Sequence, residues 1–151
     1  MAEPQVDFYV LPGDDSAARL RFACRLVEKA WLKRHRVRVQ LDPGGELENF
    51  DQLLWTFSDR AFIPHRRAGS PEDVPEPAPS PVVLADTDAA DAADGDVLVN
   101  LAATQPATEG WARIAEVIDA DSARRAKGRE RYRAYRERGL EPKTHDMGDD
   151  A

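Results

Sequence analysis

Short apolar runs alternate with longer amphipathic stretches along the chain of 151 residues. The strand candidates are rich in β-branched and aromatic residues and end at turn residues; they lie at 6–10, 36–41, 62–65, 81–85 and 96–100. The helix candidates carry apolar residues at helical spacing; they lie at 17–34, 46–56, 111–118 and 122–138. This order predicts an α/β fold of three layers, in which helices cover an open, mostly parallel sheet.

The elements predict a single domain over residues 1–138, because neither half of the chain has enough of them to close a separate core. Residues 69–81 contain five of the eleven prolines and are typical of a stiff, extended surface loop. Residues 86–95 are rich in Asp and Ala and predict a solvated acidic turn. Residues 139–151 are expected to form a C-terminal tail.

Composition predicts a soluble protein of a reducing compartment. Cys24 is the only cysteine, so no internal disulfide is possible, and its place on the apolar face of the first helix indicates a buried thiol. We expect neither a signal peptide nor a membrane-spanning segment, because no long apolar stretch exists. These features favour the cytoplasm.

The chain lacks the motifs that most catalytic α/β proteins carry. Neither G-x-x-x-x-G-K-[ST] nor G-x-G-x-x-G follows the first strand, and Asp14 and Asp15 place carboxylates where a phosphate needs donors. His35, His65 and His145 have no partner at metal-ligand spacing. We therefore expect no cofactor, no metal site and no intrinsic catalysis. An enzyme that uses the crevice of the sheet is the alternative, and it would have to show an activity.

One basic segment stands out against a net charge of −7. Residues 124–138 have a net charge of +6, so the rest of the chain carries −13. On a helical projection, four arginines and one tyrosine share an arc of about 100°. They are Arg125, Arg129, Tyr132, Arg133 and Arg136. Such a face can bind a carboxylate bidentately beside an aromatic wall.

Three interpretations of this segment remain open on charge alone. It can be a solvated basic helix whose tyrosines pack on the body of the protein. It can contact single-stranded nucleic acid directly, or it can bind an acidic peptide. Spacing does not separate the last two.

Several segments, in the same order along nearly the whole chain, resemble the chi subunit family of bacterial DNA polymerase III. The ending Arg-Glu-Arg-Tyr-Arg-Ala-Tyr-Arg at 129–136 is similar to that of the family, as are four further runs: Val-Asp-Phe-Tyr-Val at 6–10, Leu-Leu-Trp-Thr-Phe at 53–57, Phe-Ile-Pro-His at 62–65 and Asp-Val-Leu-Val-Asn-Leu at 96–101. The proline segment and the Asp/Ala turn depart from the family and are interpreted as loop insertions.

The resemblance implies a fold similar to nucleotide-binding proteins without their phosphate loop. It also implies a non-catalytic accessory subunit in DNA replication, which links the clamp loader, through the psi subunit, to the acidic C-terminal tail of single-stranded DNA-binding protein. Such a subunit contacts DNA mostly indirectly. By position, the residues that match the tail-binding helix are Arg125, Arg129, Tyr132 and Arg133. The candidates for psi binding are Trp55, Phe62, Ile63 and Pro64. Ordinary core packing is the alternative for these four.

Overall fold

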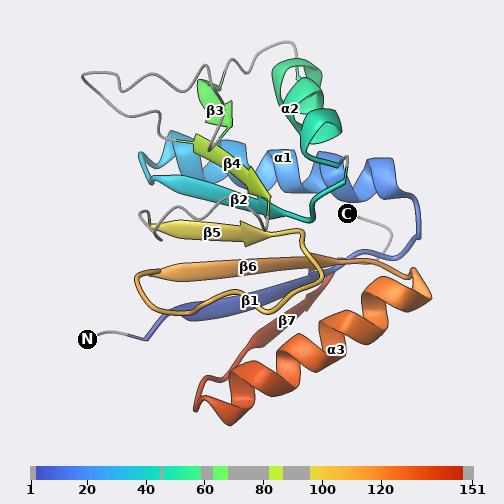
Figure 1. Ribbon diagram of the computed structural model, residues 1–151, viewed down its shortest axis with the longest axis vertical. Coiled ribbons are helices and arrows are strands. Elements are labelled where there is room, and N and C mark those ends of the chain that lie inside the picture. The colour runs from blue at the N-terminus through green and yellow to red at the C-terminus, as the bar shows by residue number, and fades with distance from the viewer. Residues whose placement is uncertain (1–2, 45, 59–62, 68–81, 87–95, 148–151) are drawn as a thin grey trace.

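The chain folds around a single seven-stranded sheet (Figure 1). The computed structural model describes residues 3–44, 46–58, 63–67, 82–86 and 96–147. Its elements in chain order are β1 (Gln5–Val10), α1 (Ser16–Leu32), β2 (Val37–Leu41), α2 (Glu46–Thr56), β3 (His65–Arg67), β4 (Val82–Asp86), β5 (Val97–Asn100), β6 (Arg113–Ile118), α3 (Ser122–Glu137) and β7 (Lys143–Asp146). The strand order is β3-β4-β2-β5-β6-β1-β7, and every neighbouring pair is parallel.

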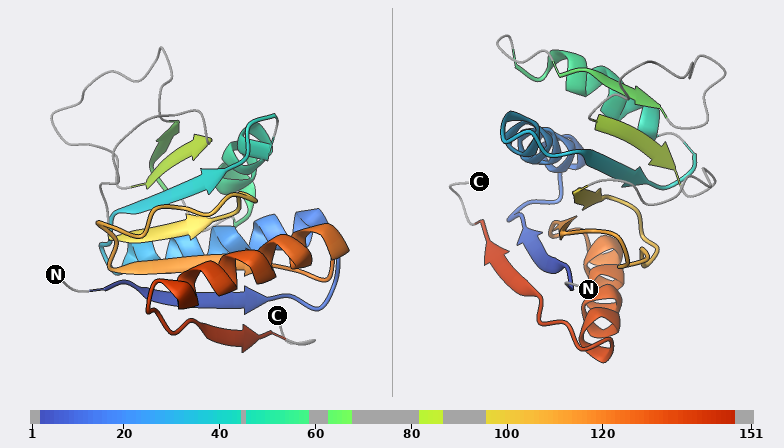
Figure 2. Two further views of the ribbon diagram at one scale, coloured as in Figure 1. Left: turned by 60° about the horizontal axis from the view of Figure 1, so that its bottom comes forward. Right: turned by 90° about the vertical axis from the view of Figure 1, so that its left-hand side faces the viewer.

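The helices form layers on both faces of the sheet, as Figure 2 shows. Helices α1 and α2 bury Phe22, Phe50 and Leu54 in a core on one face. On the opposite face, α3 packs over β1 and β6, where Phe8 and Tyr135 belong to a second core. This arrangement confirms the predicted three-layer α/β fold.

Local signals in the sequence set the limits of the first helix. The side chain of Asp15 caps α1 by accepting a hydrogen bond from the backbone N of Ala17 at 3.0 Å. The helix ends before Arg34, whose φ of 66° lies in the left-handed region. None of the helices in the described part of the chain combines the length and the hydrophobicity that a membrane span requires.

The predicted helix at 111–118 was wrong. Residues 113–118 form β6, which lies between β5 and β1. Five of its six residues are buried, because β6 lies inside the sheet and its two faces contribute to different cores, Ala115 and Val117 to one and Ile114 and Ile118 to the other. A strand buried on both faces has no alternation of apolar and polar residues, so its pattern is hard to distinguish from that of a short buried helix.

The expected tail contains a strand that the sequence prediction missed. Residues 143–146 form β7, which pairs in parallel with β1 at the edge of the sheet. All four residues are exposed, so no apolar pattern marks this strand. The strand predicted at 62–65 was largely misplaced, because residues 63 and 64 are not in a strand and β3 begins only at His65. The segments 69–81 and 87–95 lie outside the described residues.

Candidate functional site

Both ends of helix α3, which carries the basic segment, are fixed by local interactions. Asp121 caps its start and accepts a hydrogen bond from the backbone N of Arg124 at 2.9 Å. The guanidinium of Arg124 donates to both oxygens of buried Asp119, at 2.9 and 2.7 Å. The helix ends at Glu137 with Arg138 as its C-cap; Gly139 then has a φ of 86°, which is accessible to glycine, and Leu140 packs into the core.

A buried polar network beneath the middle of α3 fixes how the helix is rotated. The carboxylate of Glu116 on β6 is fully buried and accepts hydrogen bonds from Arg131 Nε at 2.9 Å, Tyr135 OH at 2.6 Å and Asn100 Nδ2 at 3.0 Å. Burial raises the pKa of Glu116, and Arg131 opposes that rise. Burial also raises the pKa of the Tyr135 phenol, which therefore keeps its proton and donates it. Because Arg131 and Tyr135 point inward, the opposite side of α3 faces solvent.

Four arginines occupy that solvent-facing side, and we call them the arginine face: Arg125, Arg129, Arg133 and Arg136. All four side chains are exposed. Among the residues that the structure describes, no carboxylate forms an ion pair with any of them, whereas Arg124, Lys127 and Arg131 on the same helix each have an acidic partner. The arginine face is therefore available to an external anion.

Tyr132 lies at the border between the arginine face and the core. Its ring packs against Phe8, with ring centroids 5.4 Å apart and planes inclined by 59°. The side chains of Tyr132 and Val10 are both half-buried at the edge of the core between α3 and β1. The contact with Phe8 fixes the ring of Tyr132 beside the exposed guanidiniums, so the ring presents an apolar surface next to positive charge. The structure thus brings together all four residues that were predicted for tail binding.

The sequence profile of one known family covers nearly the whole chain. The profile described as DNA polymerase III chi subunit, HolC, matches residues 4–143. The chain belongs to the DNA polymerase III chi subunit family. The matched range includes α3 and all the candidate site residues.

Curated chi subunits from three bacteria agree with this assignment. The protein from Pseudomonas aeruginosa is 36% identical over 142 residues, covering 93% of this chain and 95% of the relative. The one from Haemophilus influenzae is 23% identical, covering 93% and 96%. The one from Escherichia coli is also 23% identical, covering 91% and 94%. Each is called DNA polymerase III subunit chi.

In this member of the chi family, the residues predicted for psi binding have different environments. Trp55 on α2 is 37% exposed, and its ring lies against that of His65 with centroids 4.0 Å apart. Pro64 is exposed as well. Ile63 is fully buried in the core of α1 and α2, and Phe62 lies outside the described residues. The surface in this region is therefore formed by Trp55 and Pro64 rather than by Ile63.

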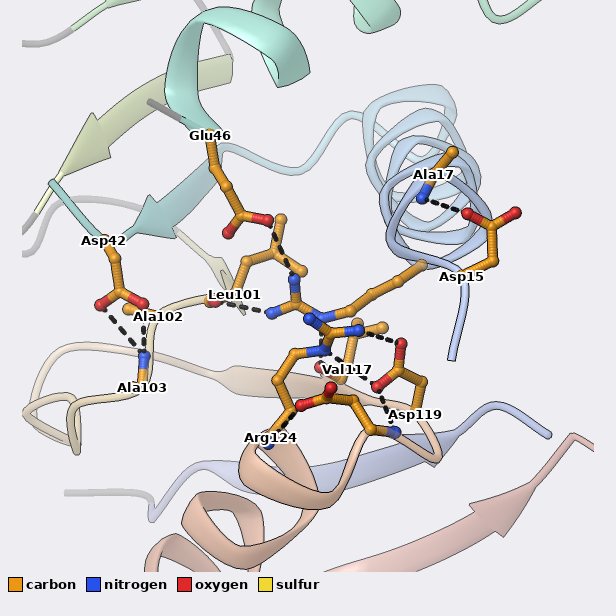
Figure 3. Close-up of polar contacts among 12 residues, drawn as sticks. Asp15, Ala17, Asp42, Glu46, Leu101, Ala102, Ala103, Val117, Asp119 and Arg124 are labelled. Carbon is orange, nitrogen blue, oxygen red and sulfur yellow. Dashed lines mark hydrogen bonds and ion pairs between the residues drawn. The ribbon is translucent and has the colours of Figure 1, made fainter. Parts of the chain in front are cut away.

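At the carboxyl ends of the strands, where open α/β sheets bind ligands, polar contacts join α1 to α2, to β6 and to the segment that follows β5 (Figure 3). Arg19 of α1 is buried and donates hydrogen bonds to the carbonyl oxygens of Leu101 at 2.7 Å and Val117 at 3.4 Å. Its guanidinium lies 3.5 Å from a carboxylate oxygen of Glu46. Burial lowers the pKa of Arg19, and Glu46 opposes this. A buried guanidinium thus lies near the start of α1 at this edge of the sheet, and its partners belong to the same chain.

The remaining candidates for chemistry are the thiol of Cys24 and clusters of metal-ligating side chains. The side chain of Cys24 is fully buried, and burial raises its pKa to about 12. This thiol therefore has the environment of a structural residue rather than of a nucleophile. Within the described ranges, no group of three or more His, Cys, Asp or Glu side chains is arranged to hold a metal ion.

Sequence reasoning missed the residues that position the arginine face. Arg131 was counted only as one more cation of the basic segment, and Glu116 fell in the stretch predicted to be a helix. A signal was present, since Glu116 is the only charged residue in the run Ile-Ala-Glu-Val-Ile at 114–118. A lone charge in a buried strand needs a partner of opposite charge, and the arginine-rich helix supplies it.

Proposed function

We propose that this chain is a non-catalytic accessory subunit of the bacterial DNA polymerase III holoenzyme, acting in DNA replication. Its relatives are named as subunits of that polymerase. In the proposal, α3 binds the acidic C-terminal tail of single-stranded DNA-binding protein, and a separate surface binds the psi subunit of the clamp loader. The observation that carries the proposal is the arginine face, four exposed arginines without an acidic partner among the described residues, beside the ring of Tyr132.

The dimensions of the arginine face suit a short acidic peptide. Arg125 and Arg133 are separated by about 12 Å along the helix axis, at ~1.5 Å per residue. An extended peptide spans that distance in about four residues, at ~3.3 Å each. Several carboxylates of a tail can therefore meet several guanidiniums at once. Tyr132 and Val10 offer apolar surface to a hydrophobic terminal residue.

Charge distribution favours a peptide over a long polyanion. The chain outside the basic segment carries −13, so a nucleic acid that extends past α3 meets net repulsion. A short acidic tail stays within the positive region. Direct binding of single-stranded DNA by α3 is the competing function, and it predicts affinity for naked DNA without a partner protein.

The psi-binding surface is proposed at Trp55 and Pro64, with Phe62 as a further candidate from the sequence. Trp55 is one of the two large apolar side chains that are exposed among the described residues, and tryptophan is common at the centres of protein interfaces. Trp55 belongs to α2, which packs on the sheet face opposite to α3. This surface is thus separate from the arginine face, so both partners can bind together.

The absence of intrinsic catalysis is also part of the proposal. It is supported by the buried position and internal hydrogen bonds of Arg19 at the carboxyl ends of the strands and by the environment of Cys24. Polymerase, nuclease and ATPase assays on the purified chain should give no turnover. An activity that is lost when one residue of this chain is changed would contradict the proposal.

Titration of a labelled tail peptide with the purified chain tests the proposed function. Arg129→Ala is expected to weaken binding by about tenfold or more, which corresponds to ~1.4 kcal/mol. Arg138→Ala is the matched control, since Arg138 is exposed at the end of α3 and lies outside the arginine face. Wild-type affinity should also fall as salt is raised, because much of the attraction is between charges. Equal affinity of both variants would refute the role of the arginine face.

A further inference from the structure

A groove of about 610 Å³ lies on the sheet face that α1 covers. Its floor includes Val97 and Val99 of β5 and Ala115 of β6. One wall is the side of α1 that carries Phe22 and Leu26. No residue of α2 or α3 lines the groove, so it is separate from both surfaces proposed above.

The groove exists because no second helix of the described chain covers this part of the sheet. The connection 101–112 between β5 and β6 contains no helix. It lies instead on the side of α3, where Trp111 is buried in the second core and the carbonyl of Ala103 accepts a hydrogen bond from Arg131. In the right-hand view of Figure 2, α1 and α3 lie on opposite sides of the sheet, and no ribbon helix accompanies β1 and β7 on the side of α1. In a parallel sheet, helices normally cover both faces.

A regular row of cations borders the groove along α1. Its members recur at every fourth residue, are all exposed and are here called the cation row: Arg21, Arg25, Lys29 and Lys33. The last three line the groove, together with Arg113 from β6. No described carboxylate forms an ion pair with the cation row. Asp96, the acidic residue of the lining, already accepts a hydrogen bond from the backbone N of Arg36 at 2.8 Å.

We propose that this groove binds an acidic amphipathic helix of a partner protein, an interaction beyond the functions proposed above. Cations four residues apart on α1 are spaced by ~6 Å along its axis, which is also the spacing of carboxylates four residues apart on a helix lying alongside. The small side chains of Ala30 and Ala115 leave room for large apolar residues of that helix. The bound helix would cover the part of the sheet that no helix of this chain covers. Its apolar side chains would contact the floor of the groove, which β5 and β6 form.

The test uses a synthetic helical peptide of about 18 residues, with leucines on one stripe and glutamates at every fourth position beside it. It is titrated into the full ¹⁵N-labelled chain and followed by NMR. Backbone signals of α1, β5 and β6 should shift in a saturable way. Lys29→Glu should weaken binding by about tenfold or more. Arg138→Glu changes the same charge away from the groove and should leave binding unchanged.

Other outcomes would overturn the proposal. The first two are the absence of saturable peptide binding and NMR shifts that are confined to α3. The others are peptide binding that survives when glutamine replaces every glutamate, and binding of an oligothymidylate in the groove that is tighter than binding of the peptide. A concentration-dependent dimer that Lys29→Glu abolishes would assign the groove to a second copy. Arg129→Ala separates this site from the proposed tail site, because it should leave peptide binding in the groove unchanged.

Discussion

The Nε atom of Arg131 on helix α3 lies 2.9 Å from Oε1 of Glu116 on strand β6, and both side chains are buried. This ion pair joins the basic helix to the centre of the sheet. It turns Arg131 inward and leaves the arginine face, which follows a different side of the same helix, toward solvent. The binding surface proposed for α3 therefore depends on a pair of residues that does not contact the ligand.

Replacing Arg131 by methionine should destabilise the protein by about 3–5 kcal/mol near pH 7, because the carboxylate of Glu116 loses its buried counter-charge. Burial already raises the pKa of Glu116, and without Arg131 that rise is less opposed. The folded variant then holds this proton to higher pH than the unfolded chain does. Stability is consequently lost as the pH rises through the folded pKa, and the cost should be smaller near pH 5.

Urea unfolding of wild type and variant at both pH values measures this difference, with Arg138→Met as an exposed control. If Arg131→Met lowers stability equally at both pH values, the uncompensated charge of Glu116 is not the cause of the destabilisation.

Gly128→Val should destabilise the protein by about 1–3 kcal/mol through overpacking. Gly128 is buried where α3 contacts β6, and a Cβ atom there would lie 3.0 Å from Cγ2 of Ile118. Combining it with Ile118→Ala should cost less than the two single changes added together, because the smaller residue makes room. Thermal unfolding of the four proteins checks this. If the stability changes of the two single variants add up to that of the double variant, residues 128 and 118 do not interact sterically.

The thiol of Cys24 should resist alkylation in the folded protein. Burial raises its pKa to about 12, so little thiolate exists near pH 8, and the side chain is fully buried. Mass spectrometry after iodoacetamide treatment should show one adduct in urea and none in buffer. Rapid labelling without denaturant would indicate that α1 opens readily or that the thiol is accessible.

Trp55→Ala should weaken binding of the psi subunit by about tenfold or more while leaving tail binding unchanged. Trp55 is 37% exposed on α2, so its indole can enter a partner's pocket. Leu32→Ala is the matched control, because Leu32 is the other exposed large apolar residue of the described chain and belongs to α1. Calorimetric titration with psi compares the three proteins. If Trp55→Ala merely lowers the melting temperature, with psi binding intact, the indole is a packing residue.

Much of the fold could be predicted from hydrophobic patterns, because the strands at 6–10 and 36–41 and the helices at 46–56 and 122–138 carry their own period and end signals. Strand β6 could not be predicted from such a pattern. Because it is buried on both faces, the run around Glu116 shows no alternation of apolar and polar residues. Strand β7 could not either, because its exposed polar residues are ordered by pairing with β1 rather than by an apolar face.

For the candidate site, helical spacing was sufficient to place Arg125, Arg129, Arg133 and Tyr132 together. Their orientation was beyond the sequence, because it is set by the contact of Arg131 with Glu116, a residue of a different element. Spacing on one helix also gives no sign of a groove that α1 forms with β5 and β6.

We propose that the arginine face and Tyr132 together form the site for an acidic tail. The most direct measurement is the affinity of the Arg129→Ala/Tyr132→Ala double mutant for the tail peptide and, separately, for naked single-stranded DNA. Circular dichroism must first show that the mutant is folded, since Tyr132 also packs against Phe8. We expect tail affinity to fall by well over tenfold, with no measurable change toward DNA. Unchanged tail affinity in the folded mutant, or a loss seen only with DNA, would contradict the account.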